Sequence, residues 1–206
     1  AGRGPLAGPV VAAAAMVPTD IAGIVDSKKL TKEEHREELY EQIIASPNVK
    51  WAVAVVDALT IDEINILQAS LLAMTMATQA ILLYPNQSSE PHPSQASCTI
   101  QGCYVVRGQS DASGMPLEQH QQHIVDPQQC IALIDGNQIP KTNMPCDAEC
   151  IVKGDSKEYL IAAASILAKV TRDRLMRGYD VMYPVYKLGQ HKGYPTAAHM
   201  ALVKQY

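Results

Sequence analysis

The stretch Cys130-Ile131-Ala132-Leu133-Ile134-Asp135-Gly136 decides the fold class. Its apolar run is short and ends in turn residues, a pattern typical of a buried β-strand. A second short apolar segment, Ile151–Val152, ends in the same way at Lys153-Gly154-Asp155. Long helical patterns run from Ile61 to about Leu83 and from Tyr159 to about Met182. Strands that alternate with helices and end in polar residues predict an α/β domain with a central mixed β-sheet flanked by helices.

The remaining elements are shorter. We expect strands at Val10–Met16, Ile21–Val25, Trp51–Val56 and Cys103–Val106, a helix that opens with a Thr31/Glu34 capping box and ends before Pro47, and a last helix at Thr196–Gln205. Residues from about 85 to 130 are rich in Pro, Ser and Gln, and a loop of this length is unusual in a compact domain. We therefore predict one domain, 1–206, with an insertion at about 85–130.

Composition limits the class of protein. With 206 residues and 47% hydrophobic content, the chain can bury one substantial core. No uninterrupted apolar run is long enough to predict a membrane-spanning helix. The net charge of −4 argues against a nucleic-acid binder only weakly, because basic residues cluster at Lys28-Lys29, Arg172/Arg174 and His191-Lys192. Five cysteines and no recognisable signal peptide favour free thiols in a reducing intracellular compartment.

Two aspartates are the first candidates for chemistry. Asp135 and Asp155 each follow a short apolar strand, and 155 − 135 = 20 residues separate them. Carboxylates that meet at neighbouring strand ends repel each other unless a cation lies between them, and hard oxygen ligands suit Mg²⁺ or Mn²⁺. The alternative is that each aspartate only caps a turn or helix.

Three further sites suit the recognition of a nucleic-acid backbone. Gly2-Arg3-Gly4 could form a nest of backbone N–H groups, although it lacks the Lys-Ser/Thr ending of a P-loop. Lys28 and Lys29 stand between a strand and a helix, where they reach a phosphate or simply face solvent. Tyr194, in His191-Lys-Gly-Tyr-Pro-Thr196, suits stacking on a sugar, or is an ordinary loop aromatic.

Two other polar residues are given structural roles. Asp173 lies within a long helix between Arg172 and Arg174, so we expect it to form surface ion pairs rather than to bind a metal. His199, in the last helix, is expected to be half-buried.

Together these blocks resemble ribonuclease HII, the type 2 ribonuclease H family, in its bacterial-like branch. The matching segments, in order, are 1–10, 26–30, 64–72, 134–137, 153–156, 163–173 and 191–196. The resemblance implies a ribonuclease H-like fold and an endonuclease that hydrolyses the RNA strand of RNA–DNA hybrids. It also implies incision on the 5′ side of ribonucleotides embedded in duplex DNA, by catalysis with two divalent cations that four acidic residues hold.

The same resemblance assigns roles to individual residues. Asp135 and Asp155 match two of the four acidic ligands. Gly2, Arg3 and Gly4 match the loop that contacts the ribose 2′-OH at the RNA–DNA junction. Tyr194 matches a tyrosine that stacks on the neighbouring deoxyribose, and Lys28 or Lys29 matches a phosphate-contacting lysine.

The other two ligands of the family form an Asp-Glu pair directly before the Ala-Gly-Arg-Gly block, and this sequence does not contain them. We therefore expect a chain trimmed at both ends that binds metal poorly and cleaves negligibly as it stands. The substrate partners would be RNA–DNA hybrids and ribonucleotide-containing duplexes, bound by a monomer. A non-catalytic nucleic-acid-binding scaffold of the same fold is the alternative.

Overall fold

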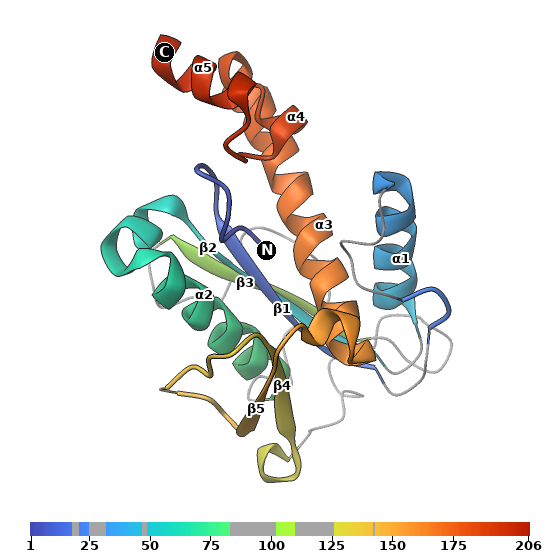
Figure 1. Ribbon diagram of the computed structural model, residues 1–206. Coiled ribbons are helices and arrows are strands. Elements are labelled where there is room, and N and C mark those ends of the chain that lie inside the picture. The colour runs from blue at the N-terminus through green and yellow to red at the C-terminus, as the bar shows by residue number, and fades with distance from the viewer. Residues whose placement is uncertain (18–20, 25–31, 47–48, 83–101, 110–125, 142) are drawn as a thin grey trace.

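The computed structural model describes residues 1–17, 21–24, 32–46, 49–82, 102–109, 126–141 and 143–206. Its strands are β1 (Val10–Met16), β2 (Lys50–Val56), β3 (Cys103–Gln109), β4 (Ile131–Asp135) and β5 (Asp147–Ile151). Its α-helices are α1 (Glu33–Ala45), α2 (Ala58–Leu82), α3 (Tyr159–Met182), α4 (Leu188–His191) and α5 (Ala197–Gln205), and 3-10 turns occupy Pro127–Gln129, Gly154–Ser156 and Pro184–Tyr186. The predicted α/β class, with a sheet flanked by helices, is confirmed (Figure 1).

The strands form two hydrogen-bonded sheets. β1, β2 and β3 make an antiparallel sheet in that order, whereas β4 and β5 make a parallel pair. The mixed strand directions that we predicted are therefore divided between the two sheets. Within the described residues, no ladder joins β1 to β4.

β1 and β2 are buried on both faces because successive side chains point to opposite sides of a strand. Val11 and Val53 pack into the cluster formed with α1 and α3, whereas Ala12 and Ala54 pack against α2. On that second face, α2 presents a stripe of small residues: Ala69, Ala73 and Ala77, all fully buried. Small side chains on both elements let the helix lie close to the sheet. Each buried valine contributes roughly 1.5–3 kcal/mol through the area that it removes from water.

α2 is interrupted at Asn65, where a single continuous helix was predicted. Asn65 has φ 68°, and its Oδ1 accepts hydrogen bonds from the N–H groups of Leu67 (3.0 Å) and Gln68 (3.1 Å). The side chain thus caps the second part of the helix, as asparagine does at helix starts. By length and composition alone, with mean hydropathy 1.3 in its most apolar window, α2 also meets the criterion for a membrane-spanning helix. The break at Asn65 and the buried alanine stripe are typical of a core helix instead.

Several further sequence expectations differ from the structure; the strand expected at Cys103–Val106, for example, extends to Gln109. The strand predicted at Ile21–Val25 is wrong over 21–24, where Gly23 has φ 87° and the Ile24 N–H bonds back to the Ile21 carbonyl to close a turn; Val25 lies outside the described residues. The strand predicted at Ile151–Val152 ends at Ile151 and begins earlier, because pairing with β4 recruits the half-exposed residues from Asp147 onward. The cap of α1 falls on Lys32, one residue after the predicted Thr31, which lies outside the described residues.

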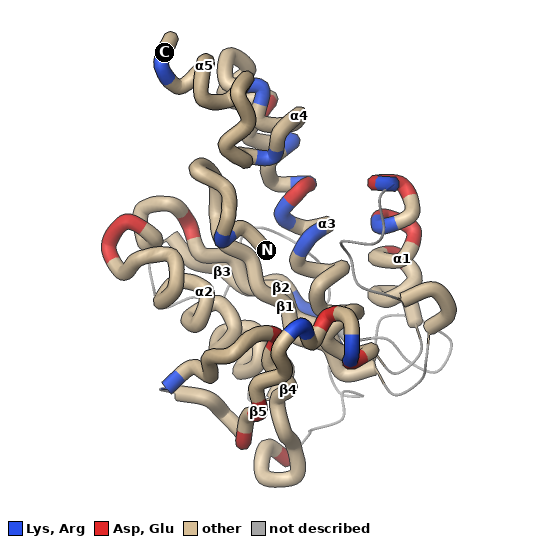
Figure 2. Tube along the Cα trace, viewed as in Figure 1, with Lys and Arg blue, Asp and Glu red and all other residues tan. Residues whose placement is uncertain are grey.

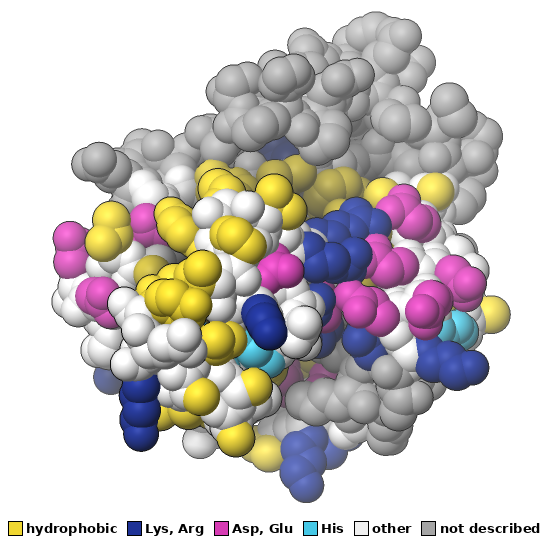
Figure 3. All heavy atoms as spheres, turned by 90° about the horizontal axis from the view of Figure 1, so that it is seen from above, with side chains coloured by type: hydrophobic (Ala, Val, Ile, Leu, Met, Phe, Trp, Pro, Cys, Tyr) yellow, Lys and Arg dark blue, Asp and Glu magenta, His cyan; other side chains and the backbone are white. Residues whose placement is uncertain are grey.

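Charged residues connect α1 to α3. Arg174 donates to Glu37 (2.6 Å) and Glu41 (2.7 Å), and Arg177 donates to Glu33 and Glu37 (2.7 Å each). Acidic and basic residues accordingly lie on both helices in Figure 2, and the two types of side chain adjoin each other in the view of Figure 3. Glu37 holds the centre of this network because both arginines bond to its carboxylate.

The network predicts a pH effect on stability. Burial raises the pKa of Glu37, but hydrogen bonds and charge from Arg174 and Arg177 outweigh it and hold the pKa below its ordinary 4.5. A carboxyl that is more acidic in the folded state stabilises the fold above the pKa of the unfolded state, and this contribution is lost as the pH falls through the folded pKa. In urea titrations between about pH 5 and pH 3, Glu37→Gln should therefore lose less stability than the wild type. Glu63→Gln, an exposed carboxyl on α2 away from this network, is the control and should follow the wild type. Equal slopes for Glu37→Gln and wild type would contradict this role.

Candidate active site

Asp135 and Asp155 lie at neighbouring strand ends. β4 ends at Asp135, which pairs in register with Ile151 at the end of β5, and the Gly136 N–H donates to the Ile151 carbonyl (3.0 Å). The Asp135 Oδ1 accepts a hydrogen bond from the Gly154 N–H (2.8 Å), the residue directly before Asp155. Asp155 itself is 4% exposed within the turn Gly154–Ser156. One carboxylate is thus bonded to the backbone that carries the other.

The donor set at this point fits a hard divalent cation only in part. Two carboxylates are suitable oxygen ligands, and beyond Asp135 Oδ1 no hydrogen bond to that carboxylate is found among the described residues. Mg²⁺ requires six oxygens, and across the described part of the chain no group of three or more His, Cys, Asp or Glu converges. The residues present therefore supply part of a metal site, with the rest left to water or to further acidic residues.

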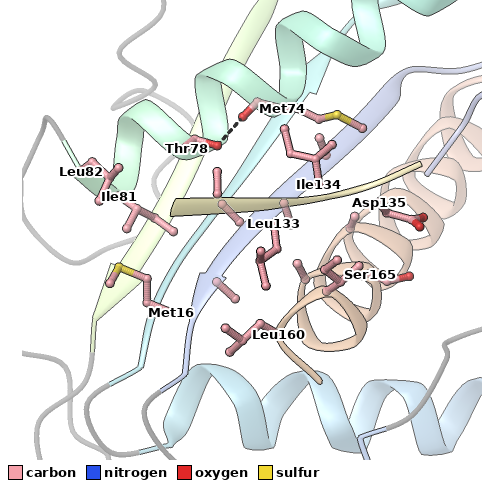
Figure 4. A pocket seen from close by; sticks show the side chains of 18 of the residues that line it. Met16, Met74, Thr78, Ile81, Leu82, Leu133, Ile134, Asp135, Leu160 and Ser165 are labelled. Atoms are coloured by element: carbon pink, nitrogen blue, oxygen red, sulfur yellow. Dashed lines mark hydrogen bonds between the residues drawn. The ribbon is translucent and has the colours of Figure 1, made fainter. Parts of the chain in front are cut away.

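A large apolar cavity separates the two sheets next to Asp135. Its volume is about 590 Å³, and β1, β4, α2 and α3 line it. Figure 4 shows Met16 and Asp135 toward opposite ends of this cavity, with Leu133 and Ile134 of β4 between them. Ala1 and Arg3 also line it. The N-terminal glycine loop therefore opens onto the same space as Asp135.

The glycine loop and the loop of Tyr194 lie against each other. A side chain added at Gly4 would meet Cε1 of the Tyr194 ring at 3.5 Å, and the Leu6 N–H donates to the Gly193 carbonyl (2.9 Å). Gly193 has φ 80°, and a Cβ there would collide with the Ala7 carbonyl oxygen. The Tyr194 ring is 42% exposed and Arg3 is exposed, so both face solvent beside the junction of the loops. The structure thus brings Gly4 into contact with Tyr194, with Arg3 exposed beside them and Gly2 buried at the base of the same loop.

The side chain of Arg172, on α3, bonds to both loops. This contact was not predicted from the sequence. Its guanidinium donates to the carbonyls of Ala7 (3.0 Å), Pro9 (3.0 Å) and Lys192 (2.9 Å), and the residue is 1% exposed. The available signal was the spacing Ala164–Ala168–Arg172–Met176, because a four-residue repeat places all four on one helix face.

Asp173 was expected to form an ion pair at the surface; it does form an ion pair, but its carboxylate is buried. Asp173 is 2% exposed and accepts a hydrogen bond from the Lys169 ammonium (2.8 Å). Lys169 in turn lies 5.9 Å from the centre of the Tyr194 ring. Asp173 therefore holds the Lys169 cation beside the exposed tyrosine.

Two histidines support the Tyr194 loop. His199 is 1% exposed, not half-buried as expected, and its ring stacks on His191 at 4.1 Å. Its Nδ1 donates to the Tyr194 carbonyl (2.9 Å), which fixes the backbone of that residue. Lys28 and Lys29, the predicted phosphate contacts, lie outside the described residues.

Comparison with known proteins places this arrangement in a family. The family model described as Ribonuclease HII matches residues 1–91 and 113–206. The chain belongs to the ribonuclease HII family. Ribonuclease HII of Caldicellulosiruptor saccharolyticus is 40% identical over 208 residues, which cover 100% of this chain and 78% of the relative. The enzymes of Polynucleobacter necessarius and Dechloromonas aromatica are 42% and 41% identical and are covered over 83% and 81% of their lengths. The predicted enzyme class, a ribonuclease, is confirmed.

The tight contact between the loops predicts that two glycines of this chain respond differently to replacement by alanine. Gly193→Ala should destabilise the fold by about 1–3 kcal/mol, because alanine disfavours a positive φ and its Cβ meets the Ala7 carbonyl. Gly178→Ala is the matched control on α3, where a Cβ meets nothing within 4 Å. It should stabilise by up to about 1 kcal/mol, through helix propensity. Thermal unfolding of both variants measures the difference, and equal midpoints would argue against the tight contact.

Proposed function

We propose that this chain is the catalytic domain of an endonuclease that hydrolyses the RNA strand of RNA–DNA hybrids and incises 5′ of ribonucleotides embedded in duplex DNA. The observation that supports this most is the hydrogen bond from Gly154 to Asp135. It ties the Asp135 carboxylate to the turn that carries Asp155, and Asp135 lines a cavity that Arg3 of the glycine loop also lines. Membership in the ribonuclease HII family supplies the reaction class.

The two joined loops provide contacts to adjacent sugars of the substrate. The loop Gly2-Arg3-Gly4 lets a strand approach the main chain closely, so its polar groups contact the ribose 2′-OH at the junction. The Tyr194 ring lies against Gly4 and stacks on the neighbouring deoxyribose, where a 2′-OH would not fit. The contact between Gly4 and Tyr194 sets the distance between the two sugar-binding positions, so that a ribose at the first is followed by a deoxyribose at the second. Lys28 or Lys29 contacts a flanking phosphate.

Asp135 and Asp155 hold the divalent cations, Mg²⁺ or Mn²⁺, in this proposal. When bound, such ions activate water and stabilise the leaving 3′ oxygen. The Gly154 N–H binds one carboxylate oxygen of Asp135 and so fixes the rotation of the side chain. The other oxygen is then held in one direction for a metal ion. Asp155 is 4% exposed in the adjoining turn, so its carboxylate has little room to rotate.

Two more carboxylates, an Asp-Glu pair preceding Ala1, complete the ligand set in our proposal. Ala1 and Val11 exchange two backbone hydrogen bonds, from the Ala1 amino group to the Val11 carbonyl (2.6 Å) and from the Val11 N–H to the Ala1 carbonyl (2.9 Å). This is the bonding of an antiparallel pair. Main chain continuing upstream of Ala1 would run along β1, between β1 and β4. Residues directly before Ala1 would then stand near Asp135, which lines the same cavity.

Cleavage assays test the proposed catalysis. With Mn²⁺ and a duplex containing one ribonucleotide, the 206-residue chain should show negligible cleavage, and the chain extended upstream with Asp-Glu should cut 5′ of the ribonucleotide. In the extended chain, Asp135→Asn or Asp155→Asn should lower the rate by at least about 100-fold, since even indirect supports of a metal often cost that much. Asp147→Asn, exposed on β5, is the control and should retain activity. Robust turnover by the 206-residue chain would refute the need for the upstream pair, and binding without cleavage by the extended chain would favour the scaffold alternative.

The role of Tyr194 is tested separately by binding. Tyr194→Ala should weaken the preference for a ribonucleotide-containing duplex over an all-DNA duplex of the same sequence more than it weakens affinity for the all-DNA duplex. Stacking on one nucleotide is worth about 1–3 kcal/mol, so the loss is measurable by fluorescence anisotropy. Tyr186→Ala, an aromatic change outside the two loops, is the control. Equal losses on the two duplexes would count against stacking at the junction.

A further inference from the structure

We propose that Arg172 is a positioning residue that fixes the distance between the glycine loop and the Tyr194 loop and thereby sets discrimination at the RNA–DNA junction. This inference rests on the proposed function of the two loops. Arg172 itself is buried and has no exposed edge for a substrate, so it acts through the groups that it holds.

The geometry of the guanidinium supports a bridging role. Its Nε donates to the Pro9 carbonyl and one terminal nitrogen donates to the Ala7 carbonyl, so two of its bonds hold the segment that follows the glycine loop. Its other terminal nitrogen donates to the Lys192 carbonyl, two residues before Tyr194. Three bonds in one plane thus fix two chain segments more than 180 positions apart against the same side chain.

Only an arginine meets this requirement. A guanidinium presents a rigid planar fork of donors, whereas a lysine offers one compact charge that cannot reach three separate carbonyls in fixed directions. Without these donors the buried carbonyls lose their partners, at a cost of about 1–3 kcal/mol each if they stay dry. The site is also shaped for this side chain, because a Cβ at Gly2 would stand 2.8 Å from the Arg172 Nε.

Few other contacts fix the distance between the two loops. Among the described residues, the bond from the Leu6 N–H to the Gly193 carbonyl is the backbone hydrogen bond that joins them directly. Gly4 and Tyr194 meet only by van der Waals contact. Loss of the Arg172 bonds should therefore let Tyr194 shift relative to the glycine loop, while the surfaces that carry each loop stay in place.

The test compares two arginine-to-lysine changes on the same helix, both of which keep the positive charge. Arg172→Lys should lower the preference for a single-ribonucleotide duplex over an all-DNA duplex by about tenfold, since a displacement of about 1 Å at a positioned contact can cost 10²-fold. Affinity for the all-DNA duplex should stay within about twofold, as expected of a change that adds or removes no surface charge. Arg174→Lys, which alters the surface network with α1, is the control and should leave the preference unchanged. In a Tyr194→Ala background, Arg172→Lys should have no further effect on the preference.

Hydrogen exchange of the Leu6 amide gives a readout that does not depend on substrate. Arg172→Lys should speed its exchange and Arg174→Lys should not. Unchanged exchange and unchanged preference in a folded Arg172→Lys protein would overturn the inference, as would an equal loss of preference with and without Tyr194. If Arg172→Lys does not fold, the same measurements are made on Arg172→Gln. If neither variant folds, Arg172 is required for folding itself, and the positioning role is overturned. Equal binding of both duplexes by the wild type would contradict the proposed function, and the Leu6 exchange would still decide whether Arg172 holds the loops.

Discussion

The hydrogen bond from the Gly154 N–H to the Asp135 carboxylate is the contact on which the candidate site depends. It is possible because β4 and β5 run parallel in register, so that both strands end at one edge. Two carboxylates at such an edge repel each other, and a backbone donor offsets part of that repulsion by fixing one oxygen. The remaining charge calls for a cation, which links the local backbone geometry to the metal chemistry of the ribonuclease HII family.

The space between the sheets is the second constraint. β1 and β4 both line an apolar cavity of about 590 Å³, and no ladder joins them in the described part of the chain. An unpaired strand edge facing an apolar space is costly, because its N–H and C=O groups lack partners. Val11 of β1 already exchanges two hydrogen bonds with Ala1, and an upstream strand, as in the proposed function, would extend that pairing between β1 and β4. Cys130, at the start of β4, packs in the same cluster as Met16 at the end of β1, so such a strand would run parallel to β4.

Much of this arrangement could be predicted from the sequence because it depends on local pattern. The helix Tyr159–Met182 and the strand Val10–Met16 follow from apolar spacing, and both have the predicted bounds. The position of Asp135 at the end of β4, with Asp155 in the turn after β5, follows from the apolar runs that precede each residue. By contrast, Asp173 was expected in surface ion pairs because an aspartate beside arginines in a helix usually pairs with them, and Arg172 was grouped with Arg174 as a basic cluster. Arg172 is instead buried by loops distant in sequence, and a single helix pattern contains no information about what will cover it.

Helix α3 connects the sheet to the two loops because its two halves carry different kinds of residue. Its first half packs small and apolar side chains, such as Ala163 and Ile166, against the sheet. Its second half contains two buried polar groups, Arg172 and Asp173, and Arg172 is bonded to both loops. Buried charges stabilise a fold less than apolar residues of similar size, but they specify one geometry, since each donor must meet its acceptor. One helix therefore connects the carboxylate edge to the loop surface, and under the proposed function a rigid connection of this kind would hold the scissile bond and the sugar junction at a fixed distance.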